Sequence, residues 1–452
     1  MESREWRFAV TISGAHGMDH LLKRVFPPLI PVWVVAFGFP LWKLGVLLGA
    51  QTFGSAVGQA PMGHLSDRHD RRLMLPTGIA LIGVAFLAFA TVPSIAALEF
   101  EIALAGTTLT GEFAAMLAAM LAVGIGSSTL HPTGYPLISQ NVSEERKGRV
   151  LGMWGSARAF GDAGAPALVG AALLVTGWRP IVAGFGLVGL AYAVYLFVAL
   201  DGFETRPAGQ VAEREGAESG GGDGNEEATD DDGSGPSLRD ADRRLYVYPV
   251  AAVFVAFVLQ LVATSGATVF LPEFLTSQYG YSFAVAGVAI TPESTASFYY
   301  SALLVTAGIV QIGTGGLVDR YDSRKLLVGF LLAGTVALAI LARVVLSPLA
   351  LFPLLLLLGA SLWGLNPARD AIVSEITPAE REGRTFGYLW TGGLLLASAS
   401  PAVVGYIGDV ASLRDGFLLL AGLVLLSAIP VALLLSDRVY LESGTAGRAG
   451  AD

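Results

Sequence analysis

The 452-residue sequence contains no cysteine, which excludes disulfide bonds, thiol nucleophiles and zinc–thiolate sites. Its five histidines are not spaced as metal ligands, and it contains no G-x-x-x-x-G-K-[ST] phosphate-binding loop. We therefore expect no metal, no cofactor and no nucleic-acid partner, and no ATP-driven activity by this chain alone. No set of nucleophile, base and orienting residue is recognisable either, so an enzyme is the least favoured class.

Charged residues are also scarce. They make up 14% of the chain, compared with about 25% in soluble globular proteins. A soluble chain of this length would form two or three domains, each needing a polar surface. Hydrophobic residues account for 53%, and the mean hydropathy is +0.61. Most of the protein surface must therefore face lipid.

Twelve apolar segments are long enough to cross a bilayer, which takes about 20 helical residues. They lie at 8–36, 42–62, 73–93, 113–140, 150–176, 179–200, 246–272, 283–314, 325–346, 348–374, 385–408 and 413–436. The sequence thus predicts an all-α polytopic membrane protein, with twelve transmembrane helices in two six-helix bundles, residues 1–200 and 245–436. The first segment resembles a signal peptide, but polar residues interrupt it and no cleavage site follows, so we interpret it as a helix.

Residues 201–244 separate the two sets of segments and differ from both in composition. They include thirteen acidic residues, five basic residues and nine glycines. Such a stretch cannot bury enough apolar surface to fold, so we predict a disordered linker. Residues 437–452 form the predicted C-terminal tail.

The placement of lysine and arginine predicts the orientation in the membrane. Basic residues follow the even-numbered segments, at Arg68, Arg71, Arg72, Arg146, Lys147, Arg149, Arg320, Arg324, Lys325, Arg381 and Arg384. The loops after odd-numbered segments offer only Lys43, Arg179, Arg343 and Arg414. Because cytoplasmic loops carry the excess of basic residues, we predict a multi-pass protein of the cell membrane with both termini and the linker in the cytoplasm.

The two halves share an internal repeat. The stretch GHLSDRHDRR at 63–72 recurs as GGLVDRYDSR at 315–324. A second correspondence, at an offset of 235 residues, pairs His131-Pro132 with Asn366-Pro367 and continues through Pro401 and Gly405. Two independent blocks in the same order indicate that the halves are homologous.

Both copies of the first block resemble the loop signature of the major facilitator superfamily, G-x-L-a-D-[RK]-x-G-R-[RK], with Asp70 in place of its second glycine. With the six-plus-six layout, the resemblance covers nearly the whole chain and implies the major facilitator fold. In that family the loop holds the cytoplasmic ends of the halves together in the outward-open state. The implied gating residues are Gly63, Asp67, Arg68, Arg71, Arg72, Gly315, Asp319, Arg320 and Arg324. The alternative is that the arginines only anchor the loop at the membrane surface.

The fifth segment resembles the antiporter motif of drug/proton exporters, G-x8-G-x3-G-P-x2-G-G. Its matching residues are Gly152, Gly161, Pro166 and Gly170, while Ala165 and Val169 replace two glycines. Small residues allow close helix packing and an internal proline bends a helix. The resemblance favours export over import.

Polar residues interrupt the first segment along one face. His16, Asp19, His20, Lys23 and Arg24 fall within an arc of roughly 140° on a helix. A charge at the bilayer centre costs from ~2.5 to over 10 kcal/mol, so such residues normally face a cavity and have a function. An alternative for the two basic residues is that they extend to the membrane surface.

These residues, the prolines that follow them and His131-Pro132 resemble exporters of the fosmidomycin-resistance type. In the fifth segment, Arg158 and Asp162 are spaced i,i+4 and can pair, either for packing or as a switch. The candidates for the substrate and proton pathway are His16, Asp19, His20, Lys23, Arg24, His131, Arg158 and Asp162.

The leading hypothesis is a monomeric secondary transporter that exports small organic molecules by alternating access and is coupled to protons. Asp19, His16 and His20 are the candidates for proton transfer, because histidine titrates near neutrality. A second hypothesis is uptake or exchange of an organic anion or phosphate ester held by Lys23, Arg24 and Arg158. A third is a transporter-like membrane sensor that acts through the linker.

The predicted orientation can be tested by proteolysis. Protease added outside intact cells should leave residues 202–243 uncut, because the linker is expected in the cytoplasm, and should cut them after lysis. The fragments are identified by immunoblotting tags at both termini. Cleavage within the linker before lysis would overturn the orientation.

Overall fold

The computed structural model describes residues 3–92, 95–98, 100–104, 107–207, 245, 247–285, 287–377, 382–436 and 439–440. Most of the predicted linker, residues 208–244, and most of the predicted tail lie outside this part of the chain.

Among the residues described, the first half contains six helical spans. They are α1 (Ser3–Lys23) with the 3-10 turn η1 (Pro27–Leu29) and α2 (Ile30–Phe37); α3 (Leu41–Ser66); α4 (Arg71–Thr91); α5 (Gly111–Ser128) with α6 (Leu130–Asn141); α7 (Glu144–Ala172); and α8 (Trp178–Ala199). The turn η3 (Ala96–Leu98) and an antiparallel pair of strands, β1 (Glu101–Leu104) and β2 (Thr107–Thr110), join α4 to α5.

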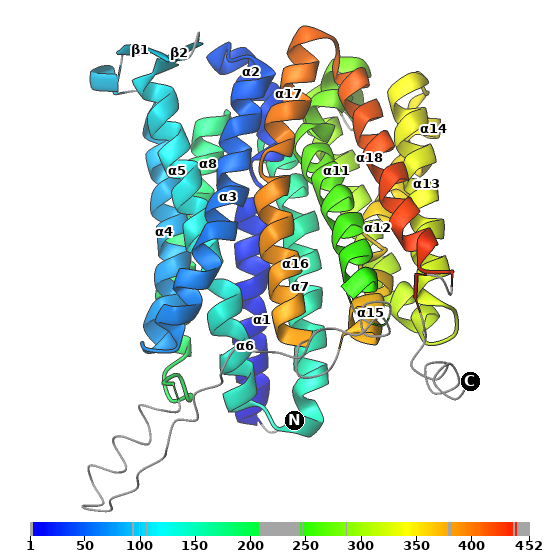
Figure 1. Cartoon of the computed structure of the whole chain (residues 1–452). Coiled ribbons are helices and arrows are strands. Elements are labelled where there is room, and N and C mark those ends of the chain that lie inside the picture. The colour runs from blue at the N-terminus through cyan, green and yellow to red at the C-terminus, as the bar shows by residue number, and fades with distance from the viewer. Residues whose placement is uncertain are drawn as a thin grey trace, which may run out of the picture.

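The second half repeats this pattern. Its spans are α11 (Tyr248–Gln278), α12 (Pro292–Val318), α13 (Ser323–Arg343), α14 (Pro348–Leu362) with α15 (Asn366–Ile376), α16 (Glu382–Ala397) with α17 (Ser400–Val410), and α18 (Leu413–Leu433). Strands β3 (Phe283–Val285) and β4 (Val288–Ile290) pair between α11 and α12. The two halves stand side by side as two helical bundles (Figure 1), which confirms the predicted all-α polytopic architecture.

Ten of the described spans are long and apolar enough to cross a membrane. The two other long helices, α3 and α7, carry more polar residues and glycines. Both lie between the bundles: α3 packs against α16 and α17, and α7 packs against α12. Helices that pack on protein over much of their surface need less apolar surface than helices that face lipid.

The structure corrects two predicted segments. Segment 8–36 is not one helix, because prolines 27, 28 and 31 lack the N–H donors that a continuous helix requires, and the chain turns after Lys23. Segment 283–314 was placed too early: residues 283–290 contain the β3–β4 hairpin, and α12 begins at Pro292, where Thr291 caps it.

Helix α1 begins and α18 ends at the same end of the molecule, here called the base; the opposite end, where α3 begins, is the apex (Figure 1). At the apex the halves are in close contact. A Cβ added to Gly45 of α3 would lie 2.3 Å from the carbonyl oxygen of Pro401, and one on Gly405 would lie 2.5 Å from that of Leu41. Only glycine allows backbones to approach this closely.

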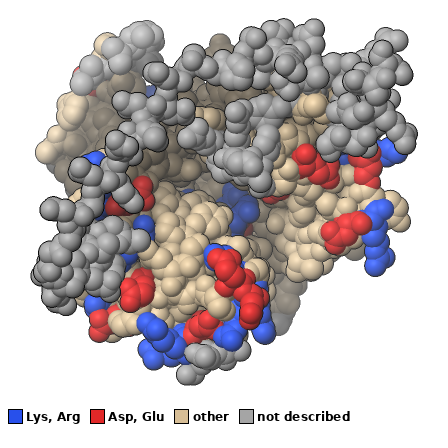
Figure 2. All heavy atoms as spheres, turned by 60° about the horizontal axis from the view of Figure 1, so that its bottom comes forward, with Lys and Arg blue, Asp and Glu red and all other residues tan. Residues whose placement is uncertain are grey.

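At the base, glycines of three helices, α3, α7 and α12, face open space. A Cβ added to Gly63, Gly152 or Gly315 would meet no atom within 4 Å. Seen from the base, the surface is hollowed between the two bundles (Figure 2). The structure is therefore closed at the apex and open at the base.

Candidate substrate and proton site

Helix α1 reaches the centre of the molecule because it packs closely on α7. A Cβ on Gly161 would lie 2.2 Å from the carbonyl oxygen of Gly17, so a larger residue would separate the helices. Gly170 lies against α12 of the other half, where an added Cβ would be 2.9 Å from Cβ of Ser297. These two glycines of the antiporter-like motif therefore make close contacts. Its proline, Pro166, is buried within the continuous helix α7, and its first glycine, Gly152, faces open space.

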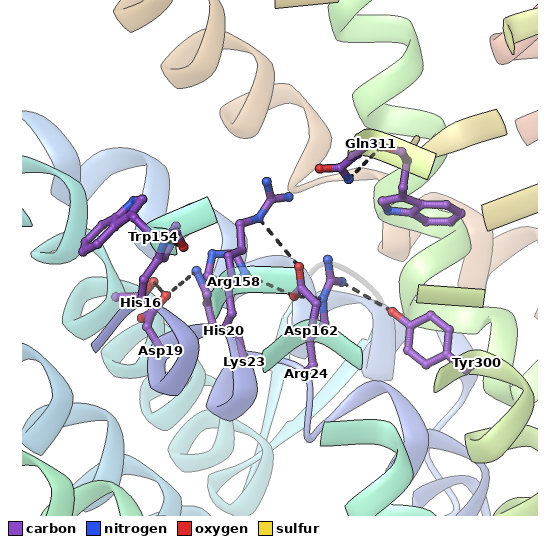
Figure 3. A network of polar contacts seen from close by, with 12 residues as sticks. His16, Asp19, His20, Lys23, Arg24, Trp154, Arg158, Asp162, Tyr300 and Gln311 are labelled. Carbon is purple, nitrogen blue, oxygen red and sulfur yellow. Dashed lines mark hydrogen bonds and ion pairs between the residues drawn. The ribbon is translucent and has the colours of Figure 1, made fainter. Parts of the chain in front are cut away.

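Asp162 of α7 is the centre of the polar network (Figure 3). Its Oδ1 accepts a hydrogen bond from Arg24 Nε at 2.7 Å and lies 3.0 Å from His20 Nδ1. Arg158, one turn before it, lies farther away, with 3.7 Å between Nε and Oδ2. The side chain of Asp162 is only 10% exposed, so its negative charge is balanced inside the protein and not by water.

Asp19 of α1 forms a second ion pair. Its Oδ2 lies 2.8 Å from Nζ of Lys23, one turn later, and accepts a hydrogen bond from Ser127 Oγ of α5 at 3.2 Å. The Asp19 side chain is 1% exposed. Together with His20, which contacts Asp162, the two ion pairs involve five of the seven residues predicted in the first and fifth segments.

The histidines lie beside this pair in the first half. Nδ1 of His16 donates to the carbonyl oxygen of Trp154 at 2.9 Å, and the two rings are tilted by 30° with their centroids 4.2 Å apart. The ring of His131 lies 5.3 Å from that of His16 and stacks on Tyr135. All eight predicted pathway residues therefore lie in one region of the first bundle.

A cavity lies between the halves beside Asp162. Its lining residues are Gly155, Arg158, Ala159, Asp162, Leu304, Ala307, Gly308, Gln311 and Trp363. The charged members of this lining belong to α7, while the second half supplies apolar, aromatic and amide groups. The Gln311 side chain is held by donating from Nε2 to the carbonyl oxygen of Trp363 at 3.0 Å.

Tyr300 of α12 connects the charge network to the second half. Its hydroxyl oxygen accepts a hydrogen bond from Arg24 Nη1 at 3.4 Å, and the residue is fully buried. Sequence reasoning missed Tyr300, Trp154 and Ser127, because none carries a charge or belongs to a recognisable motif.

The predicted gating loops lie at the base. The Asp67 side chain is 77% exposed, and its ion pair is with Arg71 of its own half, at 3.9 Å. Arg71 is buried and donates to Ser66 and Gln140, and Arg72 pairs with Asp201 at 2.5 Å.

Asp70, which departs from the family signature, caps α4 by accepting from the backbone N–H of Arg72 at 2.9 Å. Asp322 caps α13 in the same way, accepting from the N–H of Arg324. Burial raises the pKa of Asp322, but the hydrogen bonds and charge of Arg324 outweigh it and hold this pKa below its ordinary value.

Two bundles of six spans that are closed at one end, with a cavity between them whose charged groups come from α7, have the architecture of a polytopic membrane transporter. The chain belongs to the major facilitator superfamily, whose model matches residues 12–292 and 289–450. Members of this superfamily are secondary transporters and not enzymes.

Individual relatives are distant. The chain is 25% identical over 157 residues to the probable L-galactonate transporter of Escherichia coli, a match that covers 35% of this chain and 31% of that protein. A bacterial homolog of the human lysosomal transporter Spinster superposes with a TM-score of 0.73 at 14% identity, covering 97% and 98% of the two chains. The xylose transporter XylE of E. coli gives 0.68 at 15% identity, covering 95% and 96%.

The distances around Asp162 predict unequal coupling energies. Asp162→Ala should lower the free energy of unfolding by about 3 kcal/mol, because it leaves the guanidinium of Arg24, which is only 20% exposed, without its carboxylate. In double-mutant cycles, Arg24→Gln should couple to Asp162→Ala more strongly than Arg158→Gln does, since their distances to the carboxylate are 2.7 and 3.7 Å. Unfolding in detergent measures both cycles.

The exposed pair Arg72–Asp201 serves as the control and should couple by about 1 kcal/mol or less. Equal coupling energies for Arg24 and Arg158 would contradict the assignment of Arg24 as the main partner.

Proposed function

We propose that this protein is a proton-coupled exporter of small organic molecules that works by alternating access, with its base in the cytoplasm. The observation that carries the proposal is the buried carboxylate of Asp162, which binds Arg24 and His20 beside the cavity between the halves. Titratable groups at such a position can link proton binding to the arrangement of the halves.

The coupling step follows from these contacts. With Asp162 ionised, Arg24 is held at the carboxylate and also bonds to Tyr300 of the other half. A proton on Asp162 or on its partner His20 makes the charge next to Arg24 less negative and weakens the attraction that holds Arg24 there. The hydrogen bond from Arg24 to Tyr300, which joins the two halves, changes as a result. Asp19 offers a second proton site, because its protonation would release Lys23.

The proposed orientation makes the present structure inward-facing, since the base is open and the apex is closed. The Spinster homolog was captured in an inward-facing conformation, and XylE in an inward open one. In this state a substrate from the cytoplasm would reach Arg158, Gln311 and Trp363 of the cavity. The export direction rests on the antiporter-like motif of α7 and on the resemblance to exporters of the fosmidomycin-resistance type.

Coupling can be tested with Asp19→Asn, which keeps the size and hydrogen bonding of the side chain but cannot exchange a proton. In proteoliposomes screened with a panel of drugs and sugar acids, we expect it to abolish accumulation driven by a pH gradient while substrate binding persists. Asp19→Glu is the matched control and should retain part of the driven transport.

Full pH-driven accumulation by Asp19→Asn would remove Asp19 from the mechanism and leave Asp162 as the coupling residue. Loss of the folded protein would show instead that the Asp19–Lys23 pair is structural.

A second candidate function is the transport of organic anions. Arg158 lines the cavity with its side chain 32% exposed, and at 3.7 Å it binds Asp162 only weakly. Its guanidinium group can therefore take a carboxylate or phosphate ligand. The partial similarity to a probable L-galactonate transporter also favours a sugar acid.

Arg158→Gln separates the two functions. For an anion carrier, we expect it to reduce uptake of L-galactonate into proteoliposomes at least tenfold and to spare neutral substrates. Arg179→Gln, outside the cavity beside Trp178, should transport both like the unmodified protein. Equal loss of anionic and neutral transport in Arg158→Gln would reject the anion site.

A further inference from the structure

The first turn of α3, at the apex, is capped by the other half of the molecule. Its N-cap residue Pro40 provides no side-chain hydrogen bond. Instead, the backbone N–H groups of Leu41 and Trp42 donate to Oδ1 and Oδ2 of Asp409, at 2.8 and 2.9 Å. One carboxylate of α17 thus satisfies two N–H groups that the helix itself leaves free.

The position of Asp409 on its own helix is unfavourable. It lies in the last turn of α17, which ends at Val410, where the partial negative charge of the helix end repels a carboxylate. The start of α3 carries the opposite partial charge and attracts it. Asp409 therefore gains its favourable interaction only when α3 and α17 are docked at the apex.

The two hydrogen bonds lie beside a close backbone contact between the halves. Gly405 lies one turn before Asp409 and packs against the carbonyl of Leu41, and Gly45 packs against Pro401. Separating the halves at the apex would break the hydrogen bonds and expose these contacts together.

We propose that Asp409 is the gate residue that holds the apex closed. Helices α3 and α16–α17 run antiparallel, so that each ends near the start of the other. At the base, Asp67 follows the last residue of α3, its carboxylate is largely exposed, and α16 begins at Glu382. The helix pair thus has a carboxylate at each end, and Asp409 is the one engaged in the apex-closed state.

This assignment concerns the conformational equilibrium and holds whatever substrate or ion is carried. It can be tested by double electron–electron resonance without substrate, because the chain has no cysteine and spin labels attach only where one is introduced. Labels at Val35 and Leu349, both highly exposed, report the apex. Labels at Glu145 and Tyr321 report the base.

Asp409→Ala should shift the ratio of apex-closed to apex-open molecules about fivefold toward open, equivalent to about 1 kcal/mol. The apex distance should lengthen and the base distance should shorten together. Asp409→Asn, which keeps one acceptor oxygen, should give a smaller shift, and Asp409→Glu should restore most of the closed population. The conservative variants also keep the test decisive if the alanine variant folds poorly.

The matched control is Asp415→Ala. Asp415 is an acidic residue at the same end of the second half, but it bonds to Ser412 of its own half. The Asp415→Ala variant should leave the apex and base distance distributions unchanged. Unchanged distributions in Asp409→Ala, or an equal shift in Asp415→Ala, would overturn the proposal.

Discussion

The need to neutralise charge away from water governs the centre of this protein. A lone charge at the bilayer centre costs at least ~2.5 kcal/mol. Asp162 and Arg24 meet this constraint together, and Asp19 and Lys23 do so beside them. Each pair joins groups that would be costly alone, so any step that protonates one member must change the position or the partner of the other.

Close packing of small residues brings these charges together. Gly161 allows α7 to approach Gly17 of α1, and this places Asp162 within hydrogen-bonding distance of Arg24 and His20. Glycines also set the contact between the halves, where α3 meets α17. The polar network and the apex contact both depend on glycines, which leave room on a helix surface for a neighbouring backbone.

Much of the fold could be predicted from the sequence, because apolar segments of sufficient length and a repeated loop motif are local features. The polar face of α1 was equally visible, since helical spacing places its five residues in one arc. The hairpin at residues 283–290 was not predicted, because apolar content alone does not distinguish a helix from a short strand. The break after Lys23 was not predicted either, although prolines 27, 28 and 31 were visible in the sequence.

The sequence could not predict which side chains pair with one another within the site. The spacing of Arg158 and Asp162 predicted a pair, but Arg24 is closer to the carboxylate, and the two lie 138 residues apart in the chain. The hydrogen-bond partners of Tyr300 and Asp409 could not be predicted from the sequence either. Their roles depend on which helix of the other half lies opposite, and no pattern within one helix contains that information.

The unequal lining of the cavity has a consequence for how this transporter can diversify. Its charged groups come from α7, while Leu304, Gln311 and Trp363 of the second half form the remaining wall. Replacing a wall residue alters the shape and polarity presented to a solute and leaves every member of the ion-pair network in place. Solute preference can therefore change through substitutions in the second half while the ion-pair network of the first half stays intact.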